Sequence, residues 1–311
     1  MKKIQIIILI SIVLGGCASL TKTQIETVNQ FAQASKSYSA FPSKIMTGLA
    51  DIRTLRGIYA ANSMDSAEIH LQELNAAYNL RTSNYEQSQK ADVTFQIIDQ
   101  YAKSLILLSS DQYVTDLKAQ ALTLGPGLDS LIARYNTLDK NNKIPTGIGE
   151  AVSQLVVLGG KQFIRHKQAK EIKKFVTNAD DLIAVMTKNL LEFLEGKHYV
   201  QALGDSASLK YLIDYEAKAI KRDYLSYLRQ NKATIDNDKE YIKLMSDVDQ
   251  VKSLQSQTIA ATKDLRAAHK KLLEILKKRK KLTERFTELQ ELYGDVNQLK
   301  TTIGKIQTVK P

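Results

Sequence analysis

The last third of the 311-residue chain carries the apolar repeat that most restricts its fold. From Leu254 onward, positions spaced alternately four and three residues apart are mostly apolar: Leu254, Thr258, Ala261, Leu265, Ala268, Leu272, Ile275, Arg279, Leu282, Phe286, Leu289, Tyr293, Val296, Lys300 and Ile303. A repeat of this kind is typical of a coiled coil. With the approach from Tyr241, it predicts one helix of about 65 residues, about 95 Å long at the usual rise per residue.

A helix of that length cannot fold back into a compact globule, so shorter helices from the first half must pack along it. The composition agrees with this, because the chain has only 4 prolines and 14 glycines and is rich in good helix formers. The sequence therefore predicts an all-α fold, an elongated antiparallel helical bundle with a long C-terminal coiled-coil-like helix.

Breaks between the helices are predicted from proline and from capping residues. The first helix would begin between Thr21 and Gln24 and end before Phe41-Pro42, because the residue before a proline disfavours helix. Ser43 would restart the helix, and residues 62–66 would form a second break that ends in an N-cap.

Farther along, Asp92 is expected to cap a new helix that is apolar on most sides up to Leu108, which predicts a central buried helix. Gly125-Pro126-Gly127 is expected to end a helix. The loop at residues 139–149 is a candidate internal boundary within one elongated domain that covers residues 25–311.

The first residues form an export signal. Lys2 and Lys3 precede an almost continuous apolar run from Ile4 to Leu14, which ends in two glycines and Cys17. A positive start, a short apolar run and a small-residue cleavage site are the parts of a signal peptide. The run is shorter than the roughly 20 residues that a membrane-spanning helix needs.

The segment Leu14-Gly15-Gly16-Cys17 resembles the lipobox of bacterial lipoproteins. The resemblance implies cleavage between Gly16 and Cys17, diacylglycerol on the Cys17 sulfur, and an acyl chain such as palmitate on the new amino group. Residues 1–16 would be the signal peptide and 17–24 the acylated cysteine and its tether. Several acyl chains anchor a protein stably, whereas one binds reversibly. The alternative is an ordinary secretory signal followed by an incidental cysteine.

Cys17 is the only cysteine, so the chain can form no internal disulfide. Ala18 follows it in place of the aspartate that commonly retains lipoproteins in the inner membrane. The resemblance therefore implies the outer membrane, facing the periplasm, if the host is Gram-negative. The type of envelope stays open.

The charge indicates an acidic partner. The net charge of +11 falls to +9 without residues 1–16, because Lys2 and Lys3 are the only charged residues removed. Export disfavours nucleic acid and leaves anionic phospholipid, lipopolysaccharide phosphate or an acidic protein. The alternative is that the charge spread along the bundle only serves solubility.

Five consecutive basic residues are the candidate contact with a protein partner or an anionic surface: Lys277, Lys278, Arg279, Lys280 and Lys281. On a helix such a run points in all directions, and Arg279 falls on the apolar repeat itself. Either a partner binds there, or the packing loosens locally and Arg279 extends its charge into solvent.

The segment 144–164 combines glycines with Val, Leu and Ile beside a basic flank, which suits insertion into a membrane interface. The alternative is a buried bend between two helices. The tyrosines at 199, 211, 215, 224 and 227 are interpreted as residues at the edge of the core.

No catalytic, metal or cofactor site is predicted. The four histidines, His70, His166, His198 and His269, do not have the spacing of a metal motif. The carboxylate pair Asp180-Asp181 is explained by the preference of a helix N-terminus for acids.

The sequence thus favours a non-enzymatic, membrane-anchored envelope lipoprotein that binds another envelope component. A rival is a membrane-active protein that inserts residues 144–164, since its expected architecture resembles that of α-helical pore-forming toxins. An exported helical enzyme is a third hypothesis.

Overall fold

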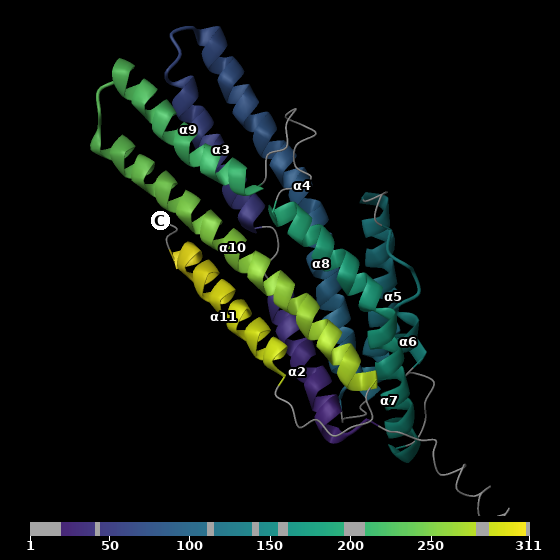
Figure 1. Cartoon of the computed structure of the whole chain (residues 1–311). Helices are drawn as coiled ribbons and strands as arrows, with labels where there is room; N and C mark the ends of the chain where they lie inside the picture. The colour runs from purple at the N-terminus through teal and green to yellow at the C-terminus, as the bar shows by residue number, and fades with distance from the viewer. Residues whose placement is uncertain are drawn as a thin grey trace, which may run out of the picture.

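The computed structural model describes residues 20–40, 44–110, 115–138, 143–154, 161–195, 209–277 and 286–308. In these ranges the chain forms ten α-helices and no strand, packed into an elongated bundle (Figure 1). The helices are α2 (Lys22–Ser39), α3 (Lys44–Ala61), α4 (Ala67–Leu108), α5 (Thr115–Leu138), α6 (Glu150–Gln154), α7 (Lys161–Asn178), α8 (Asp180–Glu195), α9 (Leu209–Gln230), α10 (Ile235–Lys277) and α11 (Thr287–Thr308). The prediction of an all-α helical bundle is confirmed.

The first two described helices begin or end where local sequence signals predict. Thr21 caps α2 in a reciprocal capping box, in which Gln24 N donates to Thr21 Oγ1 (3.1 Å) and Thr21 N donates to Gln24 Oε1 (2.9 Å). The chain leaves helix before Pro42 and resumes it at Lys44. Ser66 is the N-cap of α4, and its hydroxyl accepts a hydrogen bond from Ile69 N.

The helices α2 and α3 lie one after the other along α10, antiparallel to it and in one register. Three pairs of hydrogen-bonded residues define that register: Gln24 with Ile275, Tyr38 with Thr262, and Tyr59 with Asn237. A Cβ on Gly48 would touch Val251, which continues the same register across the break between α2 and α3.

The long helix α4 is also antiparallel to α2 and α3 and therefore runs parallel to α10. Its contacts join Asn29 to Ser109, Ser39 to Asp99, and Asp51 to Arg81. Since α10 has 43 residues, this three-part frame is about 65 Å long. We call the end where α2 begins and α10 ends the proximal end, and the end where α3 ends and α10 begins the distal end.

The remaining helices cover this frame (Figure 1). In the distal half α9 packs against α3 and α10, and in the proximal half α8 packs against α10 and α4. The helices α5, α6 and α7 lie outside α4 at the proximal half, while α11 packs against α10 and α2. In the described ranges, none of the helices has both the length and the apolar character needed to cross a bilayer.

The core contains the apolar positions predicted for the second half of α4 and for α10, whereas Ile58, Leu71 and Tyr78, which also fit apolar patterns, are exposed. The second half of α4 is enclosed, with Ile97, Ile98, Tyr101, Leu105 and Leu108 fully buried. On α10 the first seven positions of the apolar repeat, from Leu254 to Ile275, are all buried. The second half of α4 is thus the buried helical segment that the sequence predicts up to Leu108.

Two predicted helix breaks are wrong. The helix α4 runs without interruption through Asp92, because the turns that follow are packed in the core and an aspartate inside a helix costs well under about 1 kcal/mol. The helix α5 likewise contains Pro126. The glycines on either side of Pro126 allow close packing: a Cβ on Gly125 would overlap the backbone of Gly149, and one on Gly127 would meet the Gln100 side chain.

The predicted continuous C-terminal helix is not confirmed, and the prediction that this region could not fold back is wrong. The helix α10 ends at Lys277, and α11 returns along α10 with Leu289 and Val296 buried. Tyr293 donates a hydrogen bond to Gln30 O on α2 (2.9 Å). Both parts of the apolar repeat thus bury their apolar faces in one bundle. A single extended helix of about 95 Å would leave part of that apolar face in solvent.

Candidate functional site

The residues of the lipobox, Gly16 and Cys17 included, lie outside the described residues. The first described residue, Leu20, packs against the core. The side chain of Gln24 donates a hydrogen bond to Ile275 O in the last turn of α10 (3.0 Å). The chain therefore enters the bundle at the proximal end.

The basic run begins at this same end. Lys277 is the last residue of α10 and is exposed, while Lys278, Arg279, Lys280 and Lys281 lie outside the described residues. The structure thus brings Lys277 close to the start of α2, although about 250 residues separate them in the sequence. Sequence reasoning had treated these two features as unrelated.

Within segment 144–164, residues 144–149 form a bend held on α5, and residues 150–154 and 161–164 are helical. Ile144 N and O both bond to the Asn136 side chain (2.8 Å each), and Asp129 Oδ1 accepts from Gly147 N and Gly149 N (3.1 Å each). Gly147 has a φ of 84°, which favours glycine. Ile144, Ile148 and Val152 are buried. Residues 155–160 lie outside the described ranges.

Of the two histidines whose side chains the structure describes, His269 lies in the core. His269 is fully buried, and its Nε2 is 2.9 Å from the Tyr101 hydroxyl. Its Nδ1 lies 3.4 Å from Asp180 Oδ1, which also receives a hydrogen bond from Arg266 (2.5 Å). Tyr101 in turn stacks on Phe175. This network joins α4, α8 and α10.

The network also shifts the titration of its members. Burial lowers the pKa of His269 below its ordinary value of 6.5, so the imidazole is neutral at pH 7. The contacts with His269 and Arg266 lower the pKa of Asp180 below 3.8. Because His269 is enclosed, a substrate could reach its imidazole only if the bundle opened.

His70, the other histidine with a described side chain, forms no second network of this kind. His70 Nδ1 lies 2.9 Å from Ala61 O, and the side chains of His166 and His198 are outside the described residues. Among the side chains that the structure describes, no group of three or more His, Cys, Asp or Glu is arranged to hold a metal ion.

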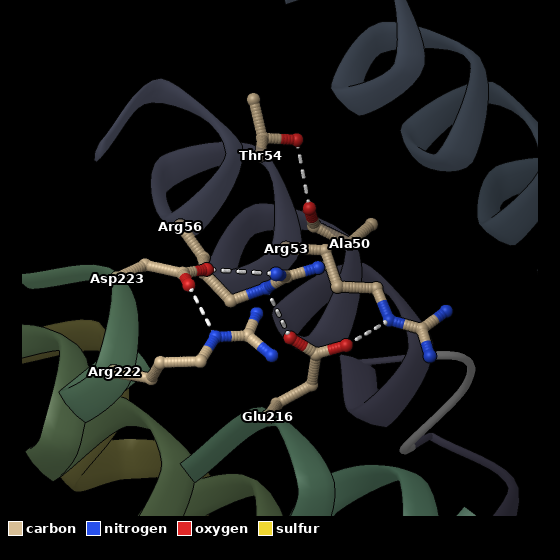
Figure 2. Close-up of polar contacts among 7 residues, drawn as sticks. All are labelled: Ala50, Arg53, Thr54, Arg56, Glu216, Arg222 and Asp223. Atoms are coloured by element: carbon tan, nitrogen blue, oxygen red, sulfur yellow. Dashed lines mark hydrogen bonds and ion pairs between the residues drawn. The ribbon is translucent and has the colours of Figure 1, made fainter. Parts of the chain in front are cut away.

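A buried ion-pair network joins α3 to α9 (Figure 2). Arg53 Nε donates to Glu216 Oε1 (2.9 Å), and Arg56 Nε lies 2.7 Å from Glu216 Oε2. Arg56 also donates to Asp223 Oδ2 (3.0 Å), whose other oxygen accepts from Arg222 (2.8 Å). The side chains of Glu216 and Arg53 are only 2 % and 6 % exposed.

Sequence reasoning missed this ion-pair network. Two signals were available: Arg53 and Arg56 lie one turn apart in a helix with few other charges, and Glu216 and Asp223 lie two turns apart on α9. A spacing of three or seven places both residues on one face of a helix. The network fixes the register of α9 on α3, because a shift of one turn would leave charges buried without partners.

Next to this network, tyrosines form an aromatic cluster at the distal end. Tyr224 stacks on Tyr241 with ring centroids 4.6 Å apart, and Tyr59 makes edge contacts with Tyr224 and Tyr227. Tyr224 is buried and Tyr227 half-buried, which agrees with their interpretation as core-edge residues, whereas Tyr215 is exposed. The side chains at 199 and 211 lie outside the described residues.

Most of the exposed large apolar side chains among the described residues gather in the distal half of the bundle. The exposed fraction reaches 74 % at Ile235 and 66 % at Tyr78. The set covers α3, α4, α9 and α10 and the turn before α4: Ile58, Met64, Ile69, Leu71, Tyr78, Tyr215, Leu225, Ile235 and Ile242. We call these residues the distal apolar surface.

Carboxylates meet where α11 packs on α10. Asp264 faces Asp295 and Glu291, and burial together with these two acids raises its pKa to about 6. A raised carboxyl pKa means that the folded state binds the proton more tightly than the unfolded state. The contribution of Asp264 to stability is therefore lost as the pH rises from about 3.8 to about 6.

Replacing Asp264 by asparagine is expected to raise the midpoint of thermal unfolding at pH values above 6, because the amide removes the repulsion from Asp295 and Glu291. It should also slow hydrogen exchange in α11 and reduce the pH dependence of stability between about 3.8 and 6. Asp249→Asn, at an exposed position of the same helix, is the control. An unchanged pH slope in D264N would contradict the prediction.

Neither a protein-family model, nor a curated protein, nor a solved structure matches this chain.

Proposed function

We propose that the chain is a lipid-anchored protein of the bacterial cell envelope and that its helical bundle binds another envelope protein through the distal apolar surface. In a Gram-negative host it would face the periplasm from the outer membrane. The observation that carries the proposal is the polarity of the bundle: the first described residues, which begin three positions after Cys17, enter at the proximal end, whereas exposed apolar side chains gather in the distal half.

The short distance between Cys17 and the folded bundle supports the anchor. Only four residue steps separate Cys17 from the cap residue Thr21. A fully extended chain covers about 14 Å in four steps. A lipid on Cys17 would hold the proximal end at the membrane surface, with the distal end of the frame up to about 65 Å from it.

The anchor is tested by labelling cells that produce the full chain with radioactive palmitate. The wild-type protein should carry the label and remain with membranes after a high-salt wash. The Cys17→Ser variant should lose both the label and the shift to the mature mass. Retention of label in C17S would contradict acylation at Cys17.

The exposure of the distal apolar surface supports protein binding. Leu71 and Tyr78 lie two turns apart on α4, and Ile235 and Ile242 lie two turns apart on α10, so each pair lies on one face of its helix. Exposed apolar side chains that share one face of a helix mark protein interfaces more often than isolated ones do, and tyrosine is enriched at interfaces. A lipid anchor at the opposite end would leave this surface accessible in the periplasm.

Photo-crosslinking in intact cells tests this binding. A photoreactive amino acid at Tyr78 or at Ile242 should give a discrete adduct with another protein, and Leu71→Lys should reduce the yield from position 78. Leu122, an equally exposed leucine on α5, is the control position. The absence of a discrete adduct, or the same adduct in equal yield from position 122, would contradict the proposal.

The rival hypothesis of membrane insertion by residues 144–164 gains no support from the described part of that segment. Ile144, Ile148 and Val152 are buried, and Asn136 and Asp129 hold the bend through four hydrogen bonds. Insertion would require this bend to detach from α5 and expose its polar backbone. Leakage of dye from anionic vesicles on addition of the non-acylated protein would revive the hypothesis.

A further inference from the structure

The helix α7 is the most basic helix that the structure describes. Over Lys161–Asn178 it contains six lysines and arginines and one acid, Glu171. In the sequence, this charge is the basic flank of the apolar segment 144–164. In the bundle, the N-terminal turns of α7 that carry part of it lie at the proximal end.

The first turns of α7 extend past the end of α4 at the proximal end. Gln168 Nε2 donates to Leu108 O (2.7 Å) and to Ser110 O (3.0 Å), where α4 ends. Phe175 stacks on Tyr101, seven residues earlier in α4, so α7 runs antiparallel to α4. The seven residues of α7 that precede Gln168 thus continue beyond the end of α4 by about 10 Å. Figure 1 shows α7 reaching past the end of α10.

The last turns of α10 bring further positive charge to this end. Its last eight residues contain Lys270, Lys271 and Lys277 and only one acid, Glu274. Lys270 and Lys277 are exposed, and so is Lys170 on α7. The hydrogen bond from Gln24 to Ile275 places these turns beside the start of α2, where the chain comes from Cys17.

We propose that the proximal end, through α7 and the last turns of α10, rests on the anionic lipid headgroups of the membrane that holds the acyl anchor. This inference rests on the proposed function, because it is the anchor that would keep the proximal end at the membrane. Headgroup phosphates attract lysines that lie within a Debye length of the surface. The contact adds a second membrane signal to the lipid and sets the direction in which the bundle points.

The test uses residues 17–311 with Cys17→Ser, so that no lipid contributes to binding. The first described helix has its own cap at Thr21, and the removed residues 1–16 are not among the described residues. Binding is measured by co-sedimentation with vesicles of phosphatidylglycerol and phosphatidylcholine, and with vesicles of phosphatidylcholine alone, at physiological ionic strength.

The proximal variant is K170E/K270E/K277E. The matched control is K232E/K239E/K243E, which makes the same change in net charge at exposed lysines of the distal end. Each lysine near an anionic surface strengthens binding about fivefold, so the proximal variant should bind anionic vesicles about a hundredfold more weakly. The control should bind anionic vesicles like the parent protein. None of the three proteins should bind vesicles of phosphatidylcholine alone.

Equal weakening by the control would show attraction by net charge alone and would overturn the proposal. So would an undiminished affinity in the proximal variant, or a parent protein that does not bind anionic vesicles. Circular dichroism of both variants verifies that they fold. Since the palmitate labelling of the full chain tests the anchor separately, failure of the anchor and failure of this contact are distinguishable.

Discussion

Replacing Glu216 by alanine is expected to lower the free energy of unfolding by about 3–5 kcal/mol. Its carboxylate is 2 % exposed and lies between the guanidinium groups of Arg53 and Arg56, the first of which is buried with it. Without Glu216, the buried Arg53 would lose the carboxylate that its Nε contacts at 2.9 Å, and Arg56 would lose the one that its Nε contacts at 2.7 Å. Urea denaturation followed by far-UV circular dichroism measures the loss.

The control for Glu216→Ala is Asp214→Ala on the same helix. Asp214 pairs with Lys252 on α10 at 2.7 Å, but both side chains are largely exposed, so its removal should cost less than about 1 kcal/mol. A loss in E216A no greater than that in D214A would contradict a structural role for the buried pairs. Because Glu216 joins α9 to α3, hydrogen exchange should increase first in α9.

Replacing His269 by alanine is expected to cost about 3–5 kcal/mol of unfolding free energy. The substitution leaves a cavity where a fully buried ring packs against Phe31 and Tyr101, and it removes the partner of the Tyr101 hydroxyl. His70→Ala provides the matched control, since His70 is half-buried with a single hydrogen bond and should cost less than about 1 kcal/mol.

The same substitution should change the acid sensitivity of the bundle. The pKa of His269 lies below 6.5 in the folded state, so its contribution to stability is present above pH 6.5 and is lost as the pH falls below that value. Asp180, with a pKa below 3.8, adds a loss that begins at lower pH. H269A should lack the decline in stability that starts near pH 6.5 in the parent protein. Thermal melts over a pH series measure this, and a decline that persists in H269A would contradict the prediction.

Local signals in the sequence predicted the local features of the fold. The caps at Thr21 and Ser66, the break at Phe41-Pro42 and the buried positions on α10 all depend on neighbours within one or two turns. The wrong breaks at Asp92 and Pro126 arose because each residue disfavours helix by itself. Tertiary packing of the flanking turns outweighs that preference.

The repeat does not predict that α11 folds back on α10. An uninterrupted spacing of four and three residues fits one long helix and two packed helices equally well, because it shows only which face of the helix is apolar. The buried networks have the same difficulty. The pairing of Arg53 with Glu216 crosses 163 residues, and that of Tyr101 with His269 crosses 168. Each partner alone resembles an ordinary surface residue on a helix.

The register of α2 and α3 along α10 also has a kinetic consequence. Hydrogen bonds join residues 251 and 224 positions apart, so the first described helix completes its core only with the last third of the chain. Closing such loops costs conformational entropy before any packing is gained, which makes folding slow. As the chain emerges from a ribosome, N-terminus first, α2 can pack on α4, but the side of α2 that faces α10 stays exposed until α10 has been made. A chain truncated before α10 would therefore be a target for chaperones and proteases, even though most of its helices had been made.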